Sequence, residues 1–117
     1  MTDTSLETRK TAAKAWFSSL QQDIISELEK LEAEVSAPLF HGPPGKFEMT
    51  PWERTRGPDG EDQGGGTMGI LKGRLFEKAG VHFSCVYGKF SEAFAAQIPG
   101  ADKSDGMFWA SGISLII

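Results

Sequence analysis

The fold predicted for this chain rests on the stretch Gln63–Gly88, which reads QGGGTMGILKGRLFEKAGVHFSCVYG. Glycines occupy the three positions after Gln63, and Lys72-Gly73 in the middle is typical of a tight hairpin turn. Such a turn predicts two short strands, over residues 67–71 and 74–78. Ala79-Gly80 predicts a second turn, which leads into another strand. The stretch therefore predicts the beginning of an antiparallel sheet.

Apolar and polar residues alternate along that last strand, over residues 81–87. One of its faces is predicted to carry Val81, Phe83, Cys85 and Tyr87. The opposite face is predicted to carry His82, Ser84 and Val86. A strand with one apolar face requires a second layer of structure to cover that face.

A long helix over residues 5–34 is the predicted second layer. Its apolar residues recur every three or four positions: Ala13, Trp16, Phe17, Leu20, Ile24, Leu28, Leu31 and Val35. The opposite, solvent-facing side is predicted to carry Lys14, Gln21, Glu29 and Glu32. At 1.5 Å per residue the helix is roughly 45 Å long, so it needs a sheet or a partner helix along its length. The predicted fold class is α+β, with this helix packed on an antiparallel sheet in one domain over residues 1–117.

Between helix and sheet, residues 37–63 are rich in proline and glycine and predict a long loop. Residues 46–49 within it are consistent with one short strand, and Trp52-Glu53-Arg54 follows shortly after. Downstream of the sheet stretch, Ser91 predicts the N-cap of a short helix over residues 92–98.

The last segment, residues 108–117, predicts a strand whose end is almost continuously apolar. A strand of that kind is normally covered on both faces. Because no turn, cap or polar residue follows it, we expect the chain to be a truncated part of a larger helix-flanked sheet domain, with an exposed sheet edge.

Composition excludes several classes of function. The net charge is −4, which argues against a nucleic-acid-binding protein. No apolar run reaches the roughly 18 residues of a membrane-spanning helix, and the N-terminus resembles no targeting peptide. We therefore expect a cytoplasmic protein that binds neither nucleic acid nor membrane. Cys85, the single cysteine, precludes an internal disulfide and is predicted to be a buried, inert thiol.

Few residues suggest chemistry on their own. Gly64–Gly66 is not followed by the Gly-Lys-Ser/Thr of a nucleotide-binding loop, and the acidic loop 59–62 lacks the spacing of a calcium site. His41 and His82 have no metal-ligand partner at two or four residues' distance. Such glycines more simply allow a neighbouring backbone or a ligand to come close.

Three motifs together point to one enzyme family. Trp52-Glu53-Arg54, the glycine cluster 64–66, and the segment FEKAGV (residues 76–81) leading to VYG (residues 86–88) resemble the oxygen-dependent coproporphyrinogen-III oxidase family. GISLII at residues 112–117 resembles the same family. The likeness extends over about residues 50–117, and the acidic insertion at residues 55–63 departs from the family pattern.

The resemblance implies oxidative decarboxylation of two propionates of coproporphyrinogen III to vinyl groups, which gives protoporphyrinogen IX in haem biosynthesis. Dioxygen is the implied electron acceptor, carbon dioxide and hydrogen peroxide leave, and no organic cofactor is implied. The resemblance leaves dependence on a divalent metal open. It also implies a homodimer built on a large antiparallel sheet flanked by helices.

The resemblance assigns two roles within this chain. The family's substrate-contacting serine falls on Ser114, although a serine hydrogen-bonded within the sheet is the simpler interpretation of the residue alone. The implied dimer contacts fall on a segment of ten residues: Gly69, Ile70, Leu71, Lys72, Gly73, Arg74, Leu75, Phe76, Glu77 and Lys78.

No catalytic residue is assigned, because the family's histidine, arginine and aspartate motifs are expected beyond residue 117. The isolated chain is therefore expected to be inactive. The alternative function is a non-catalytic oligomerisation or tetrapyrrole-binding module.

Overall fold

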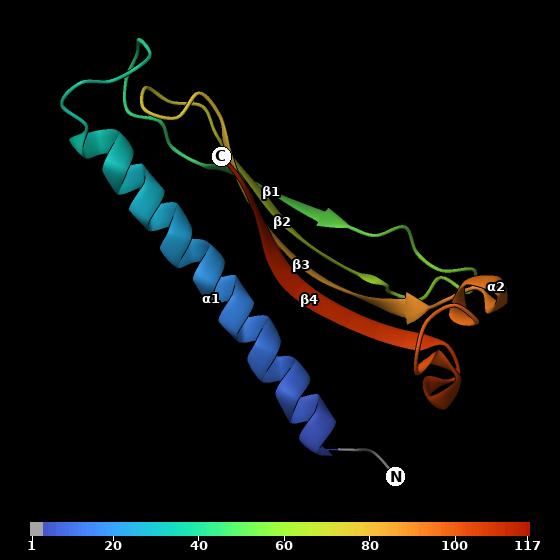
Figure 1. Ribbon diagram of the computed structural model, residues 1–117. Helices are drawn as coiled ribbons and strands as arrows, with labels where there is room; N and C mark the ends of the chain where they lie inside the picture. Colours follow the sequence, from blue (N-terminus) through green and yellow to red (C-terminus); the bar gives the residue numbers. More distant parts are fainter. Residues whose placement is uncertain (1–3) are drawn as a thin grey trace.

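The computed structural model describes residues 4–117, which form one long helix and one antiparallel sheet (Figure 1). The elements in chain order are α1 (Thr4–Glu34), β1 (Glu48–Glu53), β2 (Gly64–Leu71), β3 (Ala79–Lys89), α2 (Glu92–Ala95), the 3-10 helix η1 (Ala101–Ser104) and β4 (Met107–Ile116). The predicted α+β class and the predicted packing of the helix on the sheet are confirmed.

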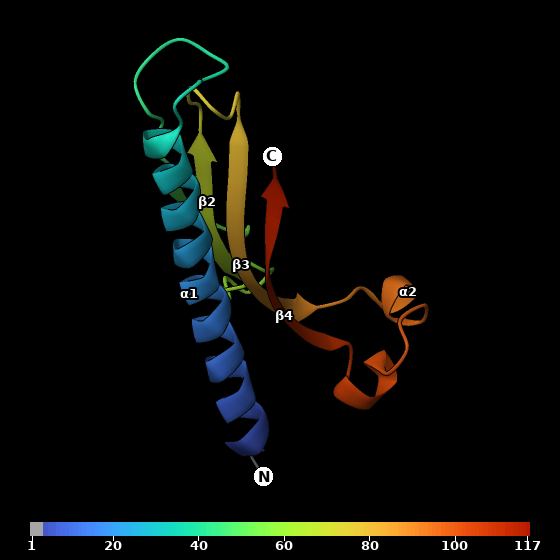
Figure 2. The same cartoon turned by 60° about the vertical axis from the view of Figure 1, so that its left-hand side comes forward.

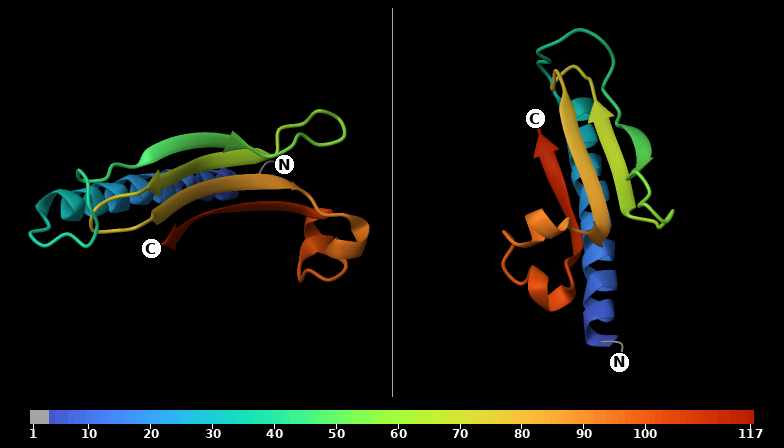
Figure 3. Two further views of the ribbon diagram at one scale, coloured as in Figure 1. Left: turned by 90° about the horizontal axis from the view of Figure 1, so that it is seen from above. Right: turned by 90° about the vertical axis from the view of Figure 1, so that its right-hand side faces the viewer.

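The sheet has four strands in the order β1-β2-β3-β4, and every neighbouring pair is antiparallel. Helix α1 lies across one face of the sheet, while α2 and η1 lie beyond the end of β3 and β4 (Figures 2 and 3). The other face carries no helix among the described residues, and we call it the open face. The alternation predicted for β3 is confirmed, since Val81, Phe83 and Cys85 are buried.

The side of α1 that faces the sheet differs from the prediction. Gln21 and Glu32, predicted to face solvent, are only 1% and 0% exposed, whereas Trp16, predicted in the apolar stripe, is 61% exposed. The Gln21 side chain donates hydrogen bonds to the carbonyl oxygens of Thr67 (2.9 Å) and Val81 (3.0 Å). The helix thus turns a partly polar side to the sheet, because this side supplies hydrogen bonds that leucine or isoleucine cannot make.

Replacing Gln21 with leucine is expected to lower the free energy of unfolding by about 2 kcal/mol. The substitution removes two buried hydrogen bonds, each worth about 1 kcal/mol net. Urea unfolding followed by circular dichroism measures the change. Gln22→Leu is the control, because Gln22 is the exposed neighbour. Equal stability of both variants would show that the amide does not tie the helix to the sheet.

The predicted hairpin at Lys72-Gly73 and the predicted strand over residues 74–78 are wrong. The connection between β2 and β3 is a seven-residue loop over residues 72–78, since Leu71 pairs directly with Ala79. The loop is folded around the Glu32 carboxylate of α1. Glu32 accepts hydrogen bonds from four backbone N–H groups: those of Gly45, Arg74, Leu75 and Phe76, at 2.7–2.8 Å.

We call this arrangement the Glu32 cradle. Burial raises the pKa of the Glu32 carboxyl, but the four N–H donors outweigh burial and lower the pKa from 4.5 to about 2. The Arg74 side chain completes the cradle, because its guanidinium donates to the carbonyl oxygens of Glu32 (2.8 Å) and Ala33 (2.9 Å) at the end of the helix. One carboxylate therefore joins the end of α1 to the loop that precedes β1 and to the loop that follows β2.

Strand β1 differs in position from the short strand predicted over residues 46–49, since it runs from Glu48 to Glu53 and contains Pro51. The N–H of Arg54 donates to the Gly64 carbonyl at 2.9 Å, so alternate residues of β1 point their N–H groups toward β2. Pro51 lies at an intervening position, where the missing N–H would face away from the sheet. Proline is tolerated there because no ladder hydrogen bond is lost.

The apolar sequence of strand β4 predicted that both of its faces are covered, and this prediction is wrong. The strand forms an edge of the sheet, and its last residues are exposed: Leu115 by 47%, Ile116 by 70% and, just beyond it, Ile117 by 66%. Apolar composition predicted burial, but no described residue supplies the second covering layer. The exposed β4 edge itself agrees with the expectation of an exposed sheet edge.

The three glycines of β2 are explained by close backbone packing. A Cβ atom at Gly64 or Gly66 would collide with carbonyl oxygens of β3, those of Cys85 and Phe83. A Cβ atom at Gly65 would collide with the carbonyl oxygen of Trp52 in β1. These glycines therefore bring the neighbouring strands close.

The short helix α2 begins where predicted. The Ser91 hydroxyl oxygen accepts a hydrogen bond from the N–H of Phe94 at 3.2 Å, as an N-cap does. The helix ends at Ala95, earlier than the predicted residue 98. Among the described residues, no helix is long and apolar enough to cross a membrane.

Candidate functional site

Ser114 lies on the open face of the sheet, near one end of β4. Paired residues of an antiparallel sheet point to the same side, so the row through Ser114 continues across His82 of β3, Met68 of β2 and Thr50 of β1. Ser114 is exposed, and its hydroxyl has no hydrogen-bond partner among residues 4–117. The hydroxyl is therefore available to a ligand on this face, which argues against the simpler interpretation of a serine bonded within the sheet.

His82 is the histidine that the register places directly opposite Ser114. Its ring lies over Gly80, where a Cβ atom would come within 2.8 Å of Nε2. Its Nδ1 atom is buried and, within the described part of the chain, lacks a hydrogen-bond partner. The sequence predicted no role for His82, because cross-strand pairing is not visible from local spacing.

The next row of the open face is nearly flat. It crosses Trp52, Gly66, Ser84 and Gly112, so two of its four positions have no side chain. Trp52 is 38% exposed at the β1 end of the row. A broad planar molecule can therefore approach the sheet backbone along this row.

Arg54 stands at the other end of the open face from Ser114. One of its N–H groups donates to the Tyr87 carbonyl oxygen at 3.0 Å, and the guanidinium lies 5.5 Å from the centre of the Phe108 ring. Phe108 is stacked on Phe90 at 4.5 Å, and Phe90 meets Phe94 edge-on at 5.3 Å. The remaining guanidinium N–H groups are available for a carboxylate, because the structure uses only one of them.

A hydrogen bond between Tyr87 and Asp62 closes the acidic loop against β3. The Tyr87 hydroxyl donates to an Asp62 carboxylate oxygen at 2.7 Å, and the Gly64 N–H donates to the other oxygen at 2.9 Å. The Gly64 N–H and then the Tyr87 hydroxyl lower the pKa of Asp62. The same bond to Asp62, followed by burial, raises the pKa of the Tyr87 hydroxyl. Asp62 is therefore a charged loop anchor.

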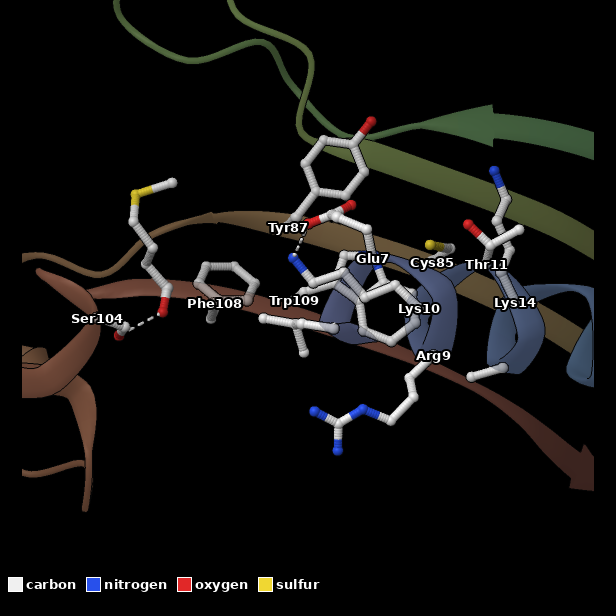
Figure 4. Close-up of a pocket in the computed structure, with 13 residues that line it drawn as sticks. Glu7, Arg9, Lys10, Thr11, Lys14, Cys85, Tyr87, Ser104, Phe108 and Trp109 are labelled. Carbon is white, nitrogen blue, oxygen red and sulfur yellow. Dashed lines mark hydrogen bonds and ion pairs between the residues drawn. The ribbon is translucent and has the colours of Figure 1, made fainter. Parts of the chain in front are cut away.

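The face that carries α1 holds a cavity of about 900 Å³ between the first half of the helix and the far ends of β3 and β4 (Figure 4). Its apolar wall comes from strand residues and from two helix residues: Cys85, Met107, Phe108, Trp109, Leu6 and Ala13. Its basic side comes from α1: Arg9, Lys10 and Lys14. The sequence did not predict this cavity, because it arises from the angle at which α1 leaves the sheet (Figure 1).

The segment predicted to make dimer contacts, Gly69–Lys78, lies at the end of β2 and in the loop of the Glu32 cradle. Gly69 and Leu71 are buried within the chain, whereas Lys72, Glu77 and Lys78 are exposed. Homodimer formation through this segment stays a prediction. Among residues 4–117, no three histidine, cysteine or acidic side chains come together as a metal site would require, and Cys85 is buried.

Comparison with known proteins gives consistent results. A family model described as Coproporphyrinogen III oxidase matches residues 12–117. Over 107 residues the chain is 45% identical to the oxygen-dependent coproporphyrinogen-III oxidase of Rickettsia bellii, and 44% and 42% identical to the proteins of the same name from Rickettsia felis and Rickettsia akari. Each alignment covers 92% of this chain and 36% of the relative, so the chain spans about a third of the relatives' length. No solved structure matches the chain significantly.

Proposed function

Since this chain belongs to the coproporphyrinogen III oxidase family, we propose that it supplies the substrate-binding sheet for the oxidative decarboxylation of coproporphyrinogen III. We call the row that contains Gly66 and Gly112 the glycine row. The observation that carries the proposal is that Ser114, Arg54 and the glycine row lie on one face, away from α1. The product would be protoporphyrinogen IX, an intermediate of haem biosynthesis.

The open face suits a macrocycle with acidic side chains. Its glycine row accepts the flat, largely apolar ring, while Ser114 and Arg54 offer hydrogen-bond donors at opposite ends of the face. Strand spacing and rise put these two residues on the order of 20 Å apart. They would thus bind different propionates of one substrate molecule, and Arg54 would hold its carboxylate through paired N–H donors.

The proposed reaction removes carbon dioxide from each of two propionates and leaves a vinyl group. Each propionate carboxylate also gives up one hydrogen of its ring-side methylene group as a proton and two electrons. Dioxygen, the co-substrate, takes these up together with one proton from the medium and leaves as hydrogen peroxide. The proposal includes no organic cofactor. The part of the chain that the structure describes binds and orients the ring, and we assign it no proton-transfer step. We also propose a cytoplasmic location.

Replacing Ser114 with alanine is expected to weaken the binding of coproporphyrin III, the oxidised and fluorescent form of the substrate, by about tenfold. A hydrogen bond to a charged carboxylate contributes about 1.5 kcal/mol, which corresponds to this change in Kd. Fluorescence titration of the 117-residue chain measures it. Ser111→Ala is the control, because Ser111 lies on the helix-side row of the same strand and bonds to the Ser84 carbonyl oxygen.

Equal Kd values for the wild-type chain and Ser114→Ala would contradict the assignment of Ser114. The alternative function, a non-catalytic tetrapyrrole-binding or oligomerisation module, is separated by product analysis. The test uses this chain together with the part that carries the remaining family motifs. Under air, the proposed function predicts that this assembly forms vinyl products from coproporphyrinogen III. Under argon, it predicts that no vinyl products form. Binding without turnover in such an assembly would favour the module.

A further inference from the structure

We propose that the cavity between α1 and the ends of β3 and β4 is a second binding site for a planar aromatic polycarboxylate, of the porphyrin class. The inference rests on the proposed function for the choice of ligand class, but it concerns the opposite face of the sheet. The cavity's volume of about 900 Å³ lies within the range of small-molecule sites.

The walls of the cavity favour a flat apolar body. Tyr87 and Trp109, a cross-strand pair on the helix side, bring two aromatic rings to its strand side, and Met107, which is 53% exposed, extends that wall toward η1. Aromatic side chains bind planar rings by stacking and edge contacts, each worth about 1 kcal/mol beyond the area buried. An extended aliphatic ligand would use this wall less well than a planar one.

The charges at the cavity favour an anion. Glu7 is the single carboxylate among the described residues that line it, and Lys10 pairs with Glu7 at 3.3 Å. Arg9 and Lys14 form no ion pair with any residue in the range 4–117. The negative charge of Asp62 lies near Lys14 and compensates it in part, although the Asp62 oxygens also accept hydrogen bonds from Gly64 and Tyr87. Arg9 therefore remains uncompensated, and Lys14 is compensated only in part.

The positions of these two cations favour a ligand with more than one carboxylate. The Arg9 guanidinium and the Lys14 ammonium point in opposite directions from the helix (Figure 4). A single carboxylate cannot contact both groups, whereas carboxylates on different edges of one macrocycle can. Lys14 also borders a smaller cavity of about 260 Å³ beside the glycines of β2.

The test is a titration of the whole chain with coproporphyrin III, followed by porphyrin fluorescence and by quenching of tryptophan emission. In the double variant Arg9→Glu/Lys14→Glu, the Kd of one of the two binding events is expected to rise at least tenfold, while the other event is unchanged. Lys30→Glu is the matched control, since Lys30 is an exposed lysine of α1 outside the cavity. Trp109→Phe is expected to remove most of the quenching that binding at the cavity causes, although Trp16 and Trp52 remain.

The open-face site and the cavity site can be disproved independently of each other. If Arg9→Glu/Lys14→Glu binds like the wild-type chain while Ser114→Ala binds more weakly, the cavity site is overturned and the open-face site stands. If only the cavity variants lose binding, the open-face site fails and the cavity site stands. Equal weakening by Lys30→Glu would show a general charge effect and overturn the cavity site. Absence of any binding would overturn both.

Discussion

Glu32→Gln is expected to lower the free energy of unfolding by about 3 kcal/mol at pH 7, a large part of the total for a chain of this size. An amide has one acceptor oxygen, so two of the four backbone N–H donors in the Glu32 cradle would face an NH2 group instead. Hydrogen bonds to a charged group contribute about 1.5 kcal/mol or more each, and two are lost.

The same variant is expected to change how stability depends on pH. The pKa of Glu32 is about 2 in the folded chain and near 4.5 when unfolded, so its contribution is fully present above pH 4.5 and is lost as pH falls toward 2. A difference of this size corresponds to about 3 kcal/mol. The stability gap between wild type and Glu32→Gln should therefore narrow steadily over that acidic range.

Urea unfolding at a series of pH values measures both effects. Glu34→Gln is the control, because Glu34 is an exposed carboxylate at the end of the same helix. The control should match wild type within about 0.5 kcal/mol. A gap between wild type and Glu32→Gln that stays constant from pH 7 to pH 2 would contradict the role given to the carboxylate charge.

Gly66→Ala is expected to destabilise the sheet by about 3 kcal/mol, because the added methyl group would overlap the Phe83 carbonyl oxygen of the neighbouring strand. Backbone atoms of a paired strand cannot move aside as a flexible side chain can. The variant must therefore separate β2 from β3 locally or lose the ladder hydrogen bonds between them.

Gly112→Ala is the matched comparison. Gly112 lies in the same row of the open face as Gly66, yet a Cβ atom there would meet no atom within 4 Å. Alanine loses less backbone conformational entropy than glycine when the chain folds. Gly112→Ala should therefore be neutral or should stabilise the fold by about 0.5 kcal/mol. Thermal melts followed by circular dichroism compare the two variants. Similar melting temperatures would show that β2 does not need its glycines for close approach.

The sequence predicted those features of the fold that depend on local periodicity. The long helix and the buried side of β3 follow from repeats of three to four and of two residues, and the structure confirms both. The Ser91 cap was also predictable, because a serine before a glutamate-led turn satisfies its neighbours' N–H groups locally.

The errors arose where distant residues decide the local conformation. The loop after β2 follows from Glu32, about forty residues earlier, and no pattern within Lys72–Lys78 reveals that its N–H groups bond to a carboxylate. Gln21 and Glu32 looked like surface residues because their buried partners are backbone atoms, which leave no trace in composition.

Only part of the candidate site could be predicted from the sequence. Family resemblance drew attention to Ser114, and pairing between strands then put Arg54 and the glycine row on the same side of the sheet. The cavity under α1 could not be predicted, since the angle between a helix and a twisted sheet has no sequence signature.

Because of Pro51, the two edge strands of the sheet, β1 and β4, differ in their capacity to pair with a further strand. At the β1 margin the outward row of amide donors is interrupted at its centre, whereas the ten residues of β4 contain no proline. We therefore expect main-chain pairing with a further strand to favour the β4 edge over the β1 edge.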